Sequence, residues 1–67
     1  MFDYDDIKDF VVFQHQSNDD SLVATLRHPH LKKRYVTKFT PNAYTVYDMD
    51  EVKEQMIDSM LKSINEE

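Results

Sequence analysis

Three histidines are the side chains in this sequence with the clearest potential for metal chemistry: His15, His28 and His30. A His-x-His spacing on a strand places both rings on one face, where they can share a metal ion. Pro29 separates His28 from His30, however, and a proline cannot donate to a strand ladder. His15 would have to reach them from another strand, and no fourth ligand is placed. The sequence therefore predicts no metal site and no cofactor.

Acidic pairs are the remaining candidates for acid–base catalysis, and they occur at Asp5/Asp6, Asp19/Asp20 and Asp50/Glu51. A catalytic carboxyl group needs a cleft that perturbs its pKa, whereas these pairs lie in polar runs typical of turns and helix starts. The chain contains no glycine and no cysteine, which excludes glycine-rich phosphate loops, the nucleophile elbow and thiolate chemistry. A chain of 67 residues also has little room for a substrate pocket. We therefore expect no catalytic residues and no enzymatic activity.

A cluster of cations lies in the middle of the chain: Arg27, Lys32, Lys33, Arg34 and Lys38. On a β-hairpin with aromatic neighbours, such side chains contact phosphates and support base stacking. The net charge of −5 repels the same polyanions, so weak nucleic-acid binding through residues 27–38 is kept as the alternative function. The competing interpretation is a solvated hairpin that balances the flanking acids and protects an edge strand.

The charges are arranged in three blocks along the chain. Residues 1–20 and 48–67 each carry a net charge of −5, whereas residues 21–47 carry +5. The acidic ends either fold around the basic middle and shield it, or leave it exposed as a patch. The size and acidity of the chain also resemble those of small phage-encoded inhibitors of host enzymes. That resemblance implies a further alternative, an acidic DNA mimic that inhibits a DNA-binding protein.

The elements that must position these residues are short. Three segments are rich in β-branched and aromatic residues, which is typical of strands: 10–16, 22–27 and 34–39. Residues 43–47 form a fourth strand or an irregular lead-in to the next element. In the turn at 17–21, asparagine or aspartate can take the left-handed conformation that glycine usually occupies. We expect an antiparallel meander of three to four strands with one face in water.

The C-terminal segment has the strongest pattern. Asp48 and Glu51 have the spacing of a capping box, and the apolar residues after them repeat at helical intervals. These apolar residues span an arc of roughly 180°, whereas about 100° is enough to face a core. The extra width predicts a second apolar neighbour for this helix. Three candidates remain: the N-terminal turn with Phe2 and Ile7, a copy of the same chain, or a foreign protein.

Together, these patterns predict a single small α+β domain over residues 1–67. The C-terminal amphipathic helix packs on one face of the sheet, and a short helical turn at residues 3–9 begins at Asp3 as its cap. No segment is long and apolar enough to span a membrane, and the acidic start lacks the basic region of a signal peptide. We therefore expect a cytoplasmic protein with no membrane contact.

The expected function is that of a non-enzymatic module that binds another protein, as an accessory or inhibitor of a cellular protein. The expected contact is the extra apolar edge of the C-terminal helix with its flanking acids: Glu54, Ile57, Asp58, Leu61 and Ile64. The same edge offers a route to a homodimer.

Overall fold

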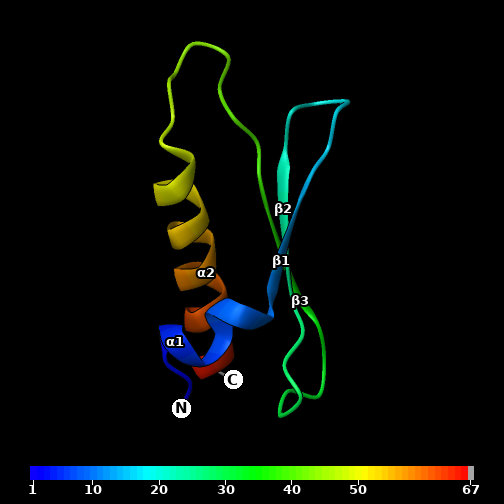
Figure 1. The fold of residues 1–67 in the computed structure, drawn as a ribbon, viewed down its shortest axis with the longest axis vertical. Coiled ribbons are helices and arrows are strands. Elements are labelled where there is room, and N and C mark those ends of the chain that lie inside the picture. The colour runs from blue at the N-terminus through cyan, green and yellow to red at the C-terminus, as the bar shows by residue number, and fades with distance from the viewer. Residues whose placement is uncertain (67) are drawn as a thin grey trace.

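The computed structural model describes residues 1–66, and Figure 1 shows a helix packed beside an antiparallel sheet. The chain runs through α1 (Tyr4–Ile7), the 3-10 turn η1 (Lys8–Phe10), β1 (Val11–His15), β2 (Leu22–Leu26), β3 (Tyr35–Phe39) and α2 (Met49–Asn65). The three strands lie in the order β1-β2-β3. This arrangement confirms the predicted α+β class, the meander, the C-terminal helix and the short N-terminal helical turn. Within residues 1–66, no helix combines the length and apolar character needed to cross a bilayer.

The central strand β2 shows why one face of the sheet is buried. Leu22, Ala24 and Leu26 are buried, whereas the residues between them are only half-buried. Because successive side chains of a strand point to opposite faces, the three buried residues line one face of the sheet. The antiparallel register pairs β2 with β1 on one side and with β3 on the other. The expected sheet with one face in water is therefore present.

The turn between β1 and β2 is made without glycine. Asp20 takes a left-handed backbone conformation, with φ of 57°, which costs most residues energy but is tolerated by Asp and Asn. The Ser21 backbone N–H donates to Asp19 Oδ1 at 3.1 Å, and Gln16 N donates to Ser21 O at 2.8 Å. The prediction that an acidic or amide residue replaces glycine in this turn is confirmed.

Helix α2 begins at the predicted cap. The Asp48 carboxylate accepts from the backbone N–H groups of Asp50 and Glu51, at 3.0 and 3.4 Å, which satisfies donors that have no partner within the helix. Five apolar residues of α2 are buried against the sheet and the N-terminal turn: Val52, Met56, Ile57, Met60 and Ile64. The helix is therefore fixed by its cap and by one wide apolar face.

The second apolar neighbour of α2 is the N-terminal turn of the same chain. Ile7 is fully buried within the core that α2 lines, and α1 contacts α2 directly. Phe2 packs against the same core, and its backbone exchanges two hydrogen bonds with the Asn65 side chain, at 3.0 and 2.9 Å. Of the three candidates that the wide helical arc left open, the structure places the N-terminal turn on α2.

The segment between β3 and α2 is a loop, so the possible fourth strand at residues 43–47 does not form. Asn42 explains why, because its side-chain Oδ1 accepts from Tyr44 N at 2.9 Å and its backbone O accepts from Thr45 N at 3.1 Å. These bonds fold the backbone into a turn and occupy donors that a strand would need. Figure 1 shows this loop at the end of the molecule opposite the two termini.

Candidate functional site

The residues expected to form a contact edge on α2 do not form one. Ile57 and Ile64 are only 5% and 8% exposed and belong to the core, while Leu61 is half-buried against it. Glu54 and Asp58 are exposed, but without the apolar residues beside them. The expectation of an accessible apolar edge is therefore corrected, because Ile57 and Ile64 are buried in the core that α2 shares with the sheet and with Ile7.

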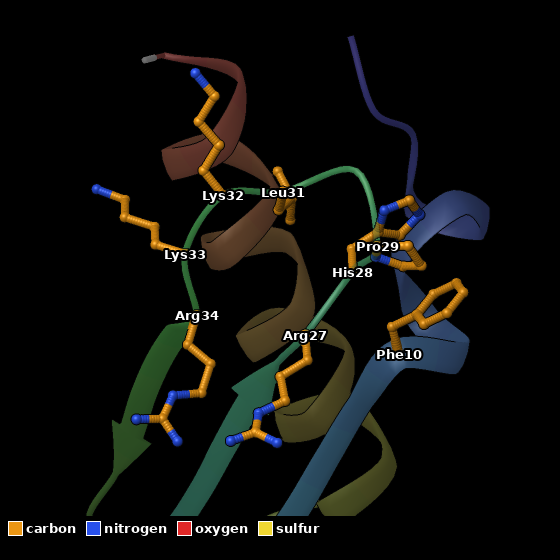
Figure 2. A pocket seen from close by; sticks show the side chains of 8 residues that line it. All are labelled: Phe10, Arg27, His28, Pro29, Leu31, Lys32, Lys33 and Arg34. Atoms are coloured by element: carbon orange, nitrogen blue, oxygen red, sulfur yellow. The ribbon is translucent and has the colours of Figure 1, made fainter.

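The five cations of the alternative nucleic-acid site are all exposed, and four of them line one hollow while Lys38 lies outside it. The Lys38 Nζ pairs with Asp19 Oδ2 at 3.1 Å, and Lys33 Nζ lies 5.3 Å from the centre of the Tyr35 ring. Figure 2 shows the side chains of Lys32 and Lys33 directed away from those of Arg27 and Arg34. Arg27, Lys32, Lys33 and Arg34 nevertheless line one hollow, in which the two arginine side chains point the same way.

A second surface is formed by the side of the sheet that α2 leaves uncovered, which we call the open face. The open face is formed by the side chains of the three strands that point away from α2, together with three residues that flank the strands. These residues are Phe10, Val12, Gln14, Val23, Thr25, Arg27, Arg34, Val36 and Lys38. No carboxylate is among them. The open face therefore differs in charge from the acidic chain that carries it.

The centre of the open face is apolar. The register pairs Val12 with Thr25 and Thr25 with Val36, so these three side chains form one row across the sheet. Val12 and Val36 are each 61% exposed, and Phe10 at the end of the face is 40% exposed. These three side chains are the exposed apolar members of the open face.

Arg27 and Arg34 lie side by side in a neighbouring row of the same face, two residues along the chain from Thr25 and Val36. Leu26 pairs with Tyr35, so the same antiparallel register places Arg27 opposite Arg34, and Arg27 N donates to Phe10 O at 3.2 Å. Figure 2 shows both guanidinium groups directed along the same face. Like charges at opposed positions of a sheet are destabilising. Across residues 1–66, no ion pair or side-chain hydrogen bond compensates either guanidinium.

Two adjoining hollows lie around these arginines. One has a volume of about 300 Å³ and lies over the sheet, lined by Phe10, Val12, Gln14, Thr25, Arg27 and Arg34. The other, which we call the loop hollow, has a volume of about 420 Å³ (Figure 2) and includes Phe10, Arg27, His28, Pro29, Leu31, Lys32 and Arg34 in its lining. Both combine an apolar floor with cations, and neither is lined by an acidic residue.

The acidic residues lie elsewhere in the fold, on the helices and in two turns. On α2, Asp50, Glu54 and Asp58 repeat every four residues and are exposed, which places them on one stripe of the helix. The helix layer and the open face thus differ in sign. The basic middle of the chain is exposed, and Asp19 of the first acidic block pairs with its Lys38.

The histidines take structural positions. The His28 ring packs edge-on against Phe2 and Phe10, with centroids 5.0 and 4.6 Å away, and its Nδ1 accepts from His30 N at 3.1 Å. His15 Nε2 lies 3.8 Å from Asp20 Oδ1 on the exposed turn. Among the described residues, no three His, Asp or Glu side chains are grouped so as to hold a metal ion.

Sequence reasoning identified the arginines but not the valines beside them. The sequence pattern that marks the valines is the alternation along each strand. Arg34, Val36 and Lys38 alternate with the residues of the third strand that face the core, and Val12 alternates with the core-facing residues of the first strand. What was missing was the position of each strand in the sheet, which brings Val12 and Val36 to either side of Thr25. Comparison with known protein families, curated proteins and solved structures gives no match for this chain.

Proposed function

We propose that this chain is a non-enzymatic, cytoplasmic protein-binding module whose contact surface is the open face of the sheet. The partner is a protein segment that presents apolar side chains flanked by carboxylates. One observation carries this proposal. Arg27 and Arg34, which have no ion-pair partner in the described part of the chain, lie beside the exposed side chains of Val12 and Val36 on one face of the sheet. By binding such a segment on a cellular protein, the chain would act as an accessory or an inhibitor of that protein.

The chemistry of the open face supports a protein partner. Arginine is among the residues enriched at binding hot spots, where it combines a charged fork with an apolar stem. A carboxylate that pairs with Arg27 and Arg34 relieves the repulsion between them, and the valine row adds apolar area that leaves water on binding. The rigid backbone of a sheet holds these groups in place before the partner arrives.

The same surface is a poor match for a nucleic acid. Single-stranded nucleic acids bind to aromatic platforms with cations along the backbone path, whereas Phe10 is the one aromatic residue among the nine that form the open face. Lys32 and Lys33 point away from the arginines (Figure 2), and the net charge of −5 opposes a polyanion. We therefore rank the nucleic-acid alternative below a protein partner.

The proposal is tested by selecting a displayed library of random peptides against the purified protein. We expect the enriched peptides to carry at least two carboxylates next to apolar residues. The R27E/R34E variant should lose this enrichment and favour basic peptides instead. The K8E/K62E variant is the matched control, because it makes the same change in net charge on the helix layer and should select as the native chain does.

Three results would contradict the proposal. The first is enrichment of peptides without acidic residues. The second is equal loss of enrichment in R27E/R34E and K8E/K62E. The third is stronger binding of a single-stranded oligonucleotide than of the selected peptides at physiological salt, which would favour the nucleic-acid alternative.

A further inference from the structure

The loop between β3 and α2 exposes two apolar side chains almost completely. Tyr44 and Val46, which we call the tip, are 98% and 97% exposed. Figure 1 shows that this loop extends beyond the start of α2 at one end of the molecule. Exposed tyrosine on a loop is typical of binding contacts, since its ring supplies a large apolar area at small entropic cost.

The backbone that carries the tip is braced. Asn42 Oδ1 accepts from Tyr44 N at 2.9 Å, and Asn42 N donates to the Tyr47 hydroxyl at 3.2 Å. The Tyr47 ring in turn packs edge-on against Phe39 of β3, with centroids 5.0 Å apart. The tip is therefore held in a defined shape while its two apolar side chains stay in water, so little ordering is needed when they bind.

The surroundings of the tip are acidic. Val46 lines a hollow together with Asp48 and Glu51, and Asp50 follows at the start of α2. A surface that receives the tip must therefore combine an apolar recess with positive charge. These two properties describe the surface to which the tip would bind.

The loop hollow at the other end of the molecule has these properties. Its floor contains Phe10, Pro29 and Leu31, and its cations include Arg27, Lys32 and Arg34. It has a volume of about 420 Å³ and is open to solvent, so a tyrosine side chain can reach it. In Figure 1 the β2–β3 loop that forms it lies at the end opposite the tip, along the 38 Å axis of the molecule.

We propose that this chain associates with itself head to tail, with the tip of one copy seated in the loop hollow of the next. The contact joins two different surfaces, so it is heterologous. Contact between two tips, or between two loop hollows, is unfavourable. The first would place acidic groups against each other, and the second would place arginines against each other. This inference rests on one part of the proposed function, which is that Arg27 and Arg34 bind an acidic and apolar segment. Here that segment belongs to a second copy of the chain.

Sedimentation analysis of the purified chain tests this inference with two complementary variants. The wild-type chain should show a rise in average mass between ~20 µM and ~1 mM that falls as salt screens the charges. Y44S/V46S removes the tip, and R27E/R34E removes the basic side of the hollow. Each variant should be monomeric, with association at least tenfold weaker, while K8E/K62E associates as the wild type does.

Mixing the two variants gives the sharpest outcome. Y44S/V46S keeps an intact hollow and R27E/R34E keeps an intact tip, so an equal mixture should form a one-to-one dimer and nothing larger. A monomeric wild-type chain throughout the concentration range, unchanged association of Y44S/V46S, or no dimer in the mixture would overturn this inference. The Y44S/V46S variant keeps the open face intact and should still select acidic peptides. If it does so while the wild-type chain stays monomeric, the head-to-tail association is wrong but the proposed function stands.

Discussion

Asn65, the last residue of α2, holds Phe2 at the start of the chain by a reciprocal pair of hydrogen bonds. Phe2 N donates to Asn65 Oδ1 at 3.0 Å, and Asn65 Nδ2 donates to Phe2 O at 2.9 Å. The two residues are separated by 63 positions in the sequence. This pair ties the start of the chain to the end of α2, where Phe2 and Ile64 line the same hollow.

Replacing Asn65 by alanine should lower the free energy of unfolding by about 1–3 kcal/mol, because two part-buried backbone groups of Phe2 lose their partners. Urea unfolding measures this change. Gln55→Ala is the matched control on the exposed side of α2, where its amide makes one bond of 3.4 Å, and should change stability by less than about 0.5 kcal/mol. Equal effects of the two substitutions would contradict a closing role for Asn65.

Ile57 and Ile64 act in folding and are not available to a partner. We expect Ile57→Val and Ile64→Val each to lower stability by about 0.5–1.5 kcal/mol, because each removes one buried methylene. Val46→Ala removes apolar atoms from a side chain that is 97% exposed and should leave stability unchanged. Denaturation midpoints that are the same for all three variants would show that the helix edge is not part of the core.

The element pattern could be predicted from the sequence because it depends on neighbours within a few residues. Alternation in the third strand, the cap at Asp48 and the helical repeat after it are all local, and the structure contains each of them. The left-handed residue in the β1–β2 turn was likewise predictable, since aspartate and asparagine replace glycine there.

The covered side of α2 could not be predicted, because it depends on contacts between the two ends of the chain. The wide apolar arc required a second neighbour, but nothing local distinguishes Ile7 and Phe2 from a second copy or a foreign protein. The open face was hidden for a similar reason. Its apolar row appears only when Val12 and Val36 are placed on either side of Thr25.

Asp20 is the position in the described chain where glycine should be tolerated best. Its φ of 57° imposes a cost on any side chain with a Cβ atom, largest for β-branched residues. We expect Asp20→Gly to match or exceed the wild type in thermal stability, and Asp20→Val to cost about 1–2 kcal/mol. Asn18→Gly, in the same turn, should cost stability through the entropy of the unfolded chain. The reverse order of the two glycine variants would contradict the assignment.

Asp19 should give the fold an acid-sensitive contribution. Hydrogen bonds from Ser21, followed by the Lys38 ammonium group, lower the pKa of Asp19 from its ordinary value of 3.8. Between the two pKa values the unfolded chain binds more protons than the folded one, so the contribution is complete above pH 3.8 and is lost as pH falls through the folded value. Urea midpoints measured against pH should therefore fall less steeply for Asp19→Asn than for the wild type. Parallel curves would be the contrary result.

The open face itself is tested most directly by mapping a peptide onto the folded protein by nuclear magnetic resonance. The probe is a peptide of alternating glutamate and valine, and its control carries lysine in place of every glutamate. We predict that amide shifts caused by the acidic probe gather at Val12, Thr25, Arg27, Arg34 and Val36, and that the lysine peptide causes none there. Shifts that gather on the exposed side of α2, or that are the same for both peptides, would contradict the account.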